Sequence, residues 1–256
     1  MRVLTVLFLF ASVVAAQEGA KDKAPGPADV EIGDPGVAIK DPAVAKQRVA
    51  QFRNKLRAAA DDAERVQLVT ALGDWDHAEI YKAASKLIKH KNEQVAIAAV
   101  VVVARQQSKK AGPKLVSALR SEDRDAVIAT ALVGLGVLGY DKKPARKAAV
   151  KYFKRDTKEP HRAAARYFGY IKAKDTFKLL AQKLDEPKNT NPPAGKSNLP
   201  VLSAADRRRL WYEWKAAYPH IRWALSEMIP GETFETTSEA RDWALSKDGK
   251  KHRIKW

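Results

Sequence analysis

The residues of this chain that could perform chemistry are few and scattered along its 256 positions. The sequence contains no Cys, which excludes disulfides, thiol catalysis and every metal site built on thiolate ligands. No two of its five His are three or four residues apart, so no helix is predicted to offer a His pair to a metal ion. A Gly-rich phosphate loop, a G-x-S-x-G elbow and an HExxH motif are also missing from the sequence. We therefore predict a protein that is not an enzyme, with no catalytic residue, no cofactor and no metal site.

Acidic residues cluster at three points without indicating a site. Asp74 and Asp76 precede His77 at an expected helix end and turn, where fewer than three metal ligands converge. The pairs at 61–62 and 122–123 precede predicted helices, whose N-terminal dipole favours carboxylates. A lyase or hydrolase with catalytic residues dispersed along the chain stays open as the weakest alternative.

Lysine is the residue type whose spacing is informative. One row of four lysines has separations of 32, 33 and 31 residues, a second row lies about one helical turn earlier, and Lys86 and Lys151 add a third. No acidic residue stands at the equivalent positions, whereas a merely solvated surface usually mixes the two signs. The rows therefore predict a binding face for an anionic ligand, with a plain solvated helix face as the alternative. The predicted binding residues are Lys82, Lys110, Lys114, Lys143, Lys147, Lys151, Lys174 and Lys178.

The charge of the chain is concentrated in the same region. The formal net charge is +17, and residues 46–189 hold 31 of the 47 basic residues but only 16 of the 30 acidic ones. A basic surface of this kind predicts an acidic protein or an anionic envelope polymer as partner. Nucleic-acid binding is the alternative, which Arg and Trp interleaved over 207–223 favour and export opposes. The oligomeric state is left open.

The lysines belong to a repeat. Small residues recur in one column at separations of 31, 32 and 33, and apolar residues recur in another at 32, 34 and 31. Each period contains two helical segments that cannot bury their apolar faces alone, so stacking of neighbours must build the core. The first column is Gly73, Ala104, Gly136 and Gly169, and the second is Leu87, Leu119, Phe153 and Leu184.

Helix signals place two helices in each period. The predicted pairs are 64–73 with 78–90, 94–106 with 111–120, 126–138 with a helix opened by Pro144, and 160–172 with 175–184. Asp125 is the expected cap of the helix at 126–138. A helix over about 46–60 is expected to cap the N-terminal end of the array.

The segment 161–171, HRAAARYFGYI, resembles the first helix of a HEAT repeat with its V-R-x-A-A-x-A-L-G-x-I pattern. The segment 128–138, IATALVGLGVL, is similar but has Ala129 in place of the Arg. The period resembles that of phycobilisome-lyase-type HEAT repeats, and the resemblance covers roughly 61–189. It implies an all-α fold, an α-solenoid of about four two-helix repeats with helical caps at both ends, acting as a protein-interaction scaffold. It also implies that the second helices line the concave surface, which would make the lysine rows a cationic groove.

The N-terminal sequence has the pattern of a targeting segment. Residues 1–16 have a positive start, an apolar run of about a dozen residues and small residues before Gln17, the pattern of a secretory signal peptide. The run is shorter than the roughly 20 residues that span a bilayer, so an uncleaved anchor is the disfavoured alternative. Residues 17–45 are rich in Pro and Gly and predict a disordered linker. We expect an exported protein, periplasmic or secreted, without a membrane span after cleavage.

The C-terminal third has a different composition. Residues 190–202 predict a Pro/Asn-rich loop, and 203–256 predict a Trp-rich helical cap in which one helix ends before a second begins at Pro219. The large rings either seal the solenoid or form an aromatic platform for sugars or bases, and the cap is favoured because a repeat array needs one. The stretch ALSEMIPGETF followed by TSEARDW resembles a terminal segment of exported planctomycete-type HEAT proteins.

Overall fold

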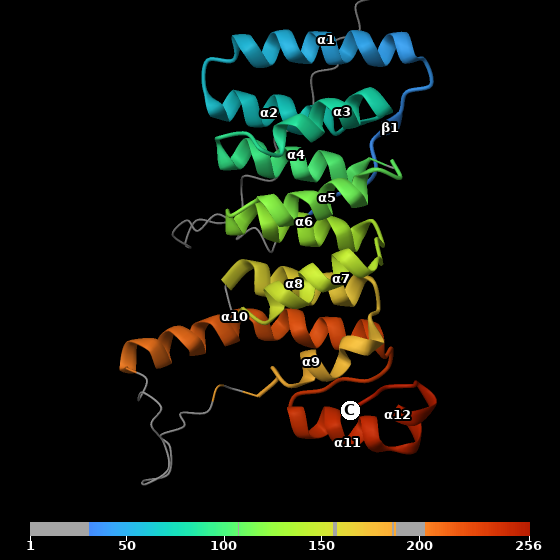
Figure 1. Cartoon of the computed structure of the whole chain (residues 1–256), viewed down its shortest axis with the longest axis vertical. Coiled ribbons are helices and arrows are strands. Elements are labelled where there is room, and N and C mark those ends of the chain that lie inside the picture. Colours follow the sequence, from blue (N-terminus) through green and yellow to red (C-terminus); the bar gives the residue numbers. More distant parts are fainter. Residues whose placement is uncertain (1–30, 107, 156–157, 186, 188–202) are drawn as a thin grey trace, which may run out of the picture.

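The computed structural model describes residues 31–106, 108–155, 158–185, 187 and 203–256. The predicted signal peptide at 1–16 and the predicted loop at 190–202 lie outside these residues. Within the described ranges, no helix combines the length and the apolar character needed to cross a membrane. Nearly all regular structure is helical, and the helices stack along one axis (Figure 1).

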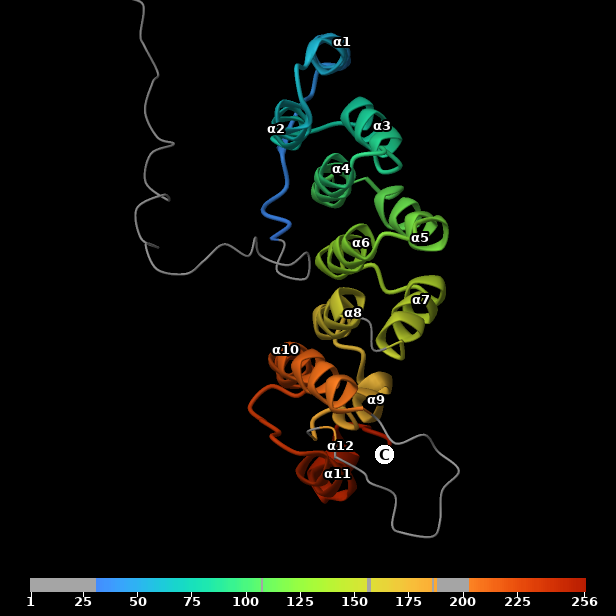
Figure 2. The same ribbon diagram turned by 90° about the vertical axis from the view of Figure 1, so that its left-hand side faces the viewer.

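The helices form two parallel layers, as a view along their axes shows (Figure 2). The first helices of the repeats pack on one another to make one layer, and the second helices make the other. This arrangement confirms the predicted all-α solenoid of about four repeats. The first layer consists of α2 (Asp62–Leu72), α4 (Glu93–Arg105), α6 (Asp125–Val137), α8 (Lys158–Tyr170) and α10 (Ala204–Met228). The second consists of α3 (Ala78–Leu87), α5 (Ala111–Ser121), α7 (Lys143–Phe153) and α9 (Phe177–Ala181), the last preceded by the 3-10 helix η2 (Lys174–Thr176).

The stack is curved, and its two ends bend toward the side of the first layer. Helices α3, α5 and α7 therefore lie on its convex side (Figure 2). The expectation that the second helices line the concave surface is therefore wrong. Close contacts in the first layer offer a physical reason. First-layer helices approach closely at small residues, such as Gly134 against Ala104 and Gly136 against Tyr170. A short spacing on one side of a stack bends the stack toward that side.

The predicted column of small residues lies where first-layer helices touch. A Cβ added at Gly136 would lie 2.7 Å from Tyr170 Cδ2, and one added at Gly169 would lie 2.9 Å from the Cα of Ala224. A Cβ at Gly73 would lie 3.1 Å from Val102 Cγ2. These distances are shorter than ordinary carbon contacts, so the glycines set the spacing between neighbouring helices. Helix α6 is buried from Ala126 to Gly136, which explains why it carries no polar stripe.

Helices α2 and α4 begin after capping residues of the expected kinds. Asp61 accepts a hydrogen bond from the Glu64 N–H at 2.8 Å, and Asn92 accepts one from the Val95 N–H at 3.0 Å. The predicted cap Asp125 is instead the first residue of α6, because Arg124 takes the cap position without a capping side-chain bond. Pro144 lies in the first turn of α7, where its missing N–H costs nothing.

Side chains also bond neighbouring repeats to one another. The Tyr152 hydroxyl donates to the Leu119 carbonyl at 2.8 Å, and the Tyr167 hydroxyl donates to the Tyr140 carbonyl at 3.1 Å. Arg124 Nη1 donates to the His90 carbonyl at 2.9 Å. Each bond spans about one repeat in sequence, so the stack is held by directed contacts as well as by apolar burial.

The N-terminal boundary differs from the predicted one. Helix α1 (Pro42–Ala58) begins four residues before the predicted start of the solenoid at 46, with Asp41 as its cap. Before it, β1 (Val37–Ala38) pairs in parallel with β2 (Trp75–Asp76), so residues 31–41 of the predicted linker are ordered against the repeats. The rest of that linker, 17–30, lies outside the described residues.

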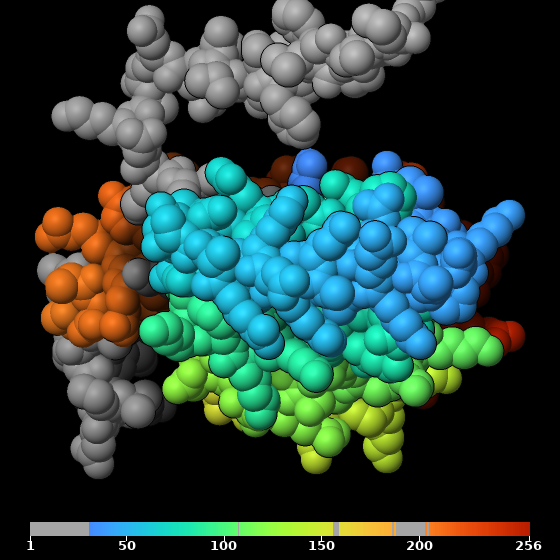
Figure 3. Space-filling view, turned by 90° about the horizontal axis from the view of Figure 1, so that it is seen from above, coloured from blue at the N-terminus to red at the C-terminus, as the bar shows by residue number. Residues whose placement is uncertain are grey.

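The C-terminal cap consists of α10 together with α11 (Thr237–Leu245) and α12 (Lys247–Lys251). The prediction of a break at Pro219 is wrong, because α10 is one helix of 25 residues that contains Pro219 and packs on α8 and α9. Trp223 packs edge-on against Tyr170 with ring centroids 5.0 Å apart, and Trp243 lies 6.0 Å from Phe177. These contacts favour the sealing role for both rings. The start of α10 projects beyond the stack (Figure 3).

A candidate lysine-rich interaction face

The eight predicted binding lysines all lie on the second, convex layer. Seven of them are exposed, and Lys114 is half-buried. We call these eight residues the lysine face. It comprises Lys82 on α3, Lys110 and Lys114 at the start of α5, Lys143, Lys147 and Lys151 on α7, Lys174 on η2, and Lys178 on α9.

The repeat places these lysines at equivalent positions of successive helices. Each helix turns its apolar stripe toward the core, and the buried stripes include Ile80 and Ala84 on α3, Leu115 on α5, and Ala145 and Ala149 on α7. Because a helix buries one stripe and solvates the other, a lysine at a fixed position in the repeat recurs on the solvent side. The structure thus brings one or more lysines of the face to each second-layer helix.

Most of these lysines have no carboxylate neighbour. Among the described residues, Lys82 is the only member of the face with a carboxylate within 4.0 Å, its Nζ lying 2.6 Å from Glu79 Oε1. That hydrogen bond lowers the pKa of Glu79. Lys151 and Lys178 lie over aromatic rings instead, 5.6 Å from the centroid of Tyr152 and 5.8 Å from that of Trp256. Cation–π contacts of this length leave the positive charge available to a partner.

Acidic residues nevertheless occur on the same layer, between the repeat positions. Arg146 bonds Asp141 with two nitrogens and reaches Asp175 Oδ2 at 2.7 Å, which ties α7 to η2. The Arg146 guanidinium lowers the pKa of Asp141. Comparing equivalent positions in the sequence missed these two carboxylates, because both lie outside the lysine rows and their pairing with Arg146 depends on the fold. The face is therefore less uniform in sign near Lys143 and Lys174 than the sequence predicts.

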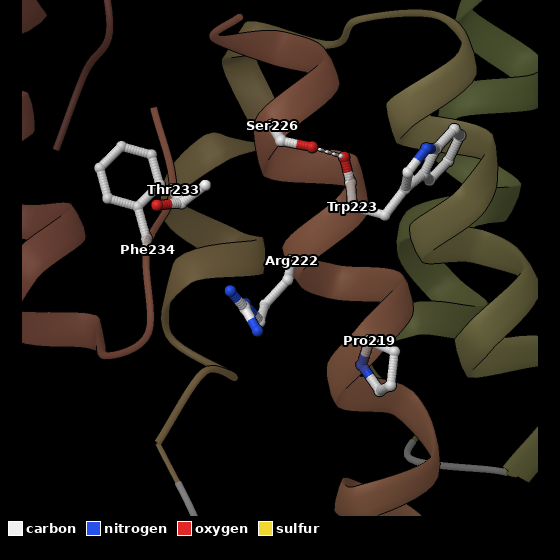
Figure 4. A pocket seen from close by; sticks show the side chains of 6 residues that line it. All are labelled: Pro219, Arg222, Trp223, Ser226, Thr233 and Phe234. Carbon is white, nitrogen blue, oxygen red and sulfur yellow. Dashed lines mark hydrogen bonds between the residues drawn. The ribbon is translucent and has the colours of Figure 1, made fainter. Parts of the chain in front are cut away.

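A second candidate is a pocket on α10 that the sequence did not predict (Figure 4). Its volume is about 290 Å³, and Arg222 points into the space between α10 and the segment carrying Phe234. Arg222 is ion-paired with Glu235, which also accepts a hydrogen bond from the Tyr218 hydroxyl at 2.6 Å. The paired charges leave no unbalanced cation for an anionic ligand. The lining residues are Pro219, Arg222, Trp223, Ser226, Thr233 and Phe234.

Three histidines make contacts that stabilise the fold. His77 Nδ1 accepts a hydrogen bond from the Glu79 N–H at the start of α3, and His90 Nδ1 accepts one from the Asn92 N–H. The His161 ring stacks on Phe153 with centroids 4.3 Å apart. Over the ranges that the structure describes, no group of three or more His, Asp or Glu could hold a metal ion.

Comparison with known proteins agrees with the fold. A family model described as HEAT repeats matches residues 49–136, from within α1 to the end of α6. A search among curated proteins finds no match. The matched part is 88 of the 256 residues, and the same two-layer packing continues through α7, α8 and α9 beyond it. Together the match and the solenoid support a HEAT-like repeat protein, of a kind whose repeats generally serve as scaffolds for protein interaction.

Proposed function

We propose that this protein is an exported, non-enzymatic interaction scaffold whose lysine face binds an acidic protein or an anionic envelope polymer. The observation that carries the proposal is the row of lysines, all exposed except the half-buried Lys114, that recurs on every second-layer helix, nearly all without a carboxylate neighbour in the described residues. Uncompensated cations on a stable helical framework attract anions at long range and make association depend on salt.

The convex position of the face defines the shape of the partner. A concave cleft would focus the field on a small ligand, whereas a convex surface presents its charges over a wide area. Each exposed ion pair contributes only about 0.2–1 kcal/mol, so useful affinity needs several lysines engaged together. A long polyanion or a broad acidic protein surface meets that need, and a small anion does not.

The test is a titration of the mature chain with poly-L-glutamate at several salt concentrations. Changing Lys82, Lys114, Lys147 and Lys178 together to Glu should weaken binding at least tenfold and flatten its salt dependence. A matched control applies the same charge change away from the lysine face, at Lys55 and Arg57 of α1 and Lys247 and Lys250 of α12, all exposed. Equal losses in both variants would mean that only net charge matters, and the proposed face would be abandoned.

Nucleic-acid binding is the second candidate function, and one observation favours it. At the projecting start of α10, Tyr212 is 63% exposed and Lys215 Nζ lies 4.7 Å from the Trp211 ring centroid. Exposed aromatic and basic side chains together suit unpaired bases. The same titration with single-stranded DNA tests this function. Changing Trp211 and Tyr212 to Ala should reduce DNA binding while leaving poly-L-glutamate binding intact, and only millimolar DNA affinity in the unaltered protein would refute it.

Export is part of the proposal and is tested separately. The small residues Ala15 and Ala16 before Gln17 support cleavage at that point. Expression of the full chain in a secreting host, followed by N-terminal sequencing of the released protein, should give a chain that starts at Gln17. Retention of the intact N-terminus inside the cell would refute this part.

A further inference from the structure

Residues 31–39 form an extended segment, which we call the strap, laid along the α2 and α4 side of the stack (Figure 2). The Val37 N–H donates to the Asp74 carbonyl at 2.8 Å, and the Ile39 N–H donates to the Asp76 carbonyl at 3.0 Å. These bonds make the parallel pairing between β1 and β2. The strap therefore binds the turn between α2 and α3 as an added strand, a common mode of peptide recognition.

Two further contacts fix the position of the strap. Ile32 is only 4% exposed and belongs to the hydrophobic core. The Asp34 carbonyl accepts a hydrogen bond from Arg105 Nε, at the end of α4, at 2.6 Å. Both contacts lie before the paired strand, so the strap is held at three points along its length.

Gly36 adds a steric requirement. A Cβ at this position would lie 2.6 Å from the Trp75 carbonyl carbon and 2.7 Å from the Gly73 carbonyl oxygen. Both are backbone atoms, which cannot move aside as a flexible side chain can. A segment that binds here therefore needs an aliphatic residue followed, four positions later, by glycine.

The surface beneath the strap, which we call the strap seat, consists of residues 73–77 and Arg105. It is braced from the solenoid, because the buried side chain of Gln106 donates to the Trp75 carbonyl at 2.9 Å and accepts from the His77 N–H at 3.2 Å. The Arg48 guanidinium covers the Trp75 ring at 3.7 Å, and Arg48 Nε is buried without a hydrogen-bond partner. The seat thus has its own support from the solenoid, and Arg105 is the arginine that contacts the strap.

The strap itself is mostly open to solvent. Ile32 is its only buried residue, and Val37 is 66% exposed. Its acidic residues Glu31 and Asp34 are both exposed, and the seat offers them no excess of positive charge, because it contains Asp74 and Asp76 and its Arg105 lies 3.9 Å from Asp74. A segment held at a few points and otherwise solvated can be replaced by another segment that makes the same contacts.

We propose that the strap seat is a docking site for an extended peptide of a partner protein, and that the strap occupies it as an internal competitor. The partner peptide carries an aliphatic residue in the place of Ile32, a backbone carbonyl that accepts a hydrogen bond from Arg105, and a glycine in the place of Gly36. Tethering gives the strap a high effective concentration, so the site opens only to a partner that binds more tightly or is itself tethered nearby. This site is separate from the lysine face on the convex layer.

The experiment uses the full chain with a specific protease site inserted between Lys40 and Asp41. Cutting frees the strap from its tether, and a labelled peptide with the sequence of residues 31–40 is then titrated by fluorescence anisotropy. We expect micromolar binding to the cut protein and at least tenfold weaker binding to the uncut one. The matched control is the same peptide with Gly36→Val, which should bind at least tenfold more weakly than the native peptide. Equal binding of both peptides, or no binding to a cut protein that keeps its helical circular dichroism, overturns the proposal.

A second measurement applies if the cut protein unfolds. In the uncut full chain, Gly36→Val should release the strap, raise hydrogen exchange at the Val37 and Ile39 amides at least tenfold, and open the seat to the native peptide. Exchange in α6 and α8 should stay unchanged, which would show that the solenoid remains folded. Protected Val37 and Ile39 amides in this variant, or released amides without peptide binding, would overturn the proposal.

Discussion

Replacing Gly169 by Ala tests the close approach that shapes the solenoid. Gly169 lies on α8 against α10, where an added Cβ would fall 2.9 Å from the Ala224 Cα and 2.6 Å from Trp223 Cζ3. The Ala224 contact is with backbone, so the two helices must move apart by roughly 0.5–1 Å to reach ordinary carbon contact. That movement also disturbs the packing between Trp223 and Tyr170.

Two effects of opposite sign determine the magnitude of this change. Ala favours a helix over Gly by about 1 kcal/mol, which stabilises the variant. Overpacking of a close-packed contact costs typically about 1–3 kcal/mol, and separation of α8 from α10 removes apolar contact along both helices. We therefore expect Gly169→Ala to lower the free energy of unfolding by about 1–2 kcal/mol, and Gly169→Val to lower it by about 3 kcal/mol or more.

Urea unfolding of the full chain, followed by circular dichroism, measures this loss as a lower midpoint at unchanged slope. The control is Gly139→Ala, since Gly139 has open space around it but a positive φ of 58°. The free energy of unfolding of that variant should be lower by about 1 kcal/mol through backbone strain alone, and the fluorescence of Trp223 should not change. A Gly169→Ala protein as stable as the unaltered one, with unchanged fluorescence, would refute the close approach of α8 and α10.

Three further changes test bonds between and beside the repeats. Both carboxylate oxygens of Glu122 accept hydrogen bonds from Arg124 at 2.7 Å, which lowers the pKa of Glu122 from 4.5 to about 2. Glu122→Gln should therefore lower the free energy of unfolding by up to about 3 kcal/mol at pH 7. Because the folded-state pKa is the lower one, urea midpoints should show this loss in full above pH 4.5 and shrinking toward pH 2, whereas Asp123→Asn in the same loop should change them little. Tyr152→Phe removes the bond to the Leu119 carbonyl and should cost about 1 kcal/mol in urea unfolding, without changing poly-L-glutamate affinity. Trp214→Phe removes the bond from Trp214 Nε1 to the Leu184 carbonyl and should lower the thermal midpoint by a few degrees, and an unchanged midpoint would mean that this ring does not help to seal the end.

The helical framework could be predicted from the sequence because each repeat shows the same pattern of apolar residues and helix-end signals. Observed helix ends lie within about three residues of the predicted ones for most pairs, since caps such as Asn92 and breakers such as Pro144 act locally. Pro219 misled the prediction, because the loss of one backbone bond is offset by packing along the rest of α10. The strap was missed because a two-residue strand beside Pro35 and Gly36 carries no periodicity.

The layout of the lysine face was predicted from the sequence only in part. Equivalent repeat positions correctly placed the lysines on one layer, but Arg146 and its two carboxylates were invisible to that comparison because their pairing depends on the fold. The side of the bend could in principle be predicted from the column of small residues. Small residues such as Gly136 allow close approach in the first layer, and a stack curves toward its more closely spaced side, so the array curves away from the lysines. A convex lysine face spreads its charges apart, which favours a partner that wraps around the solenoid over one that enters it.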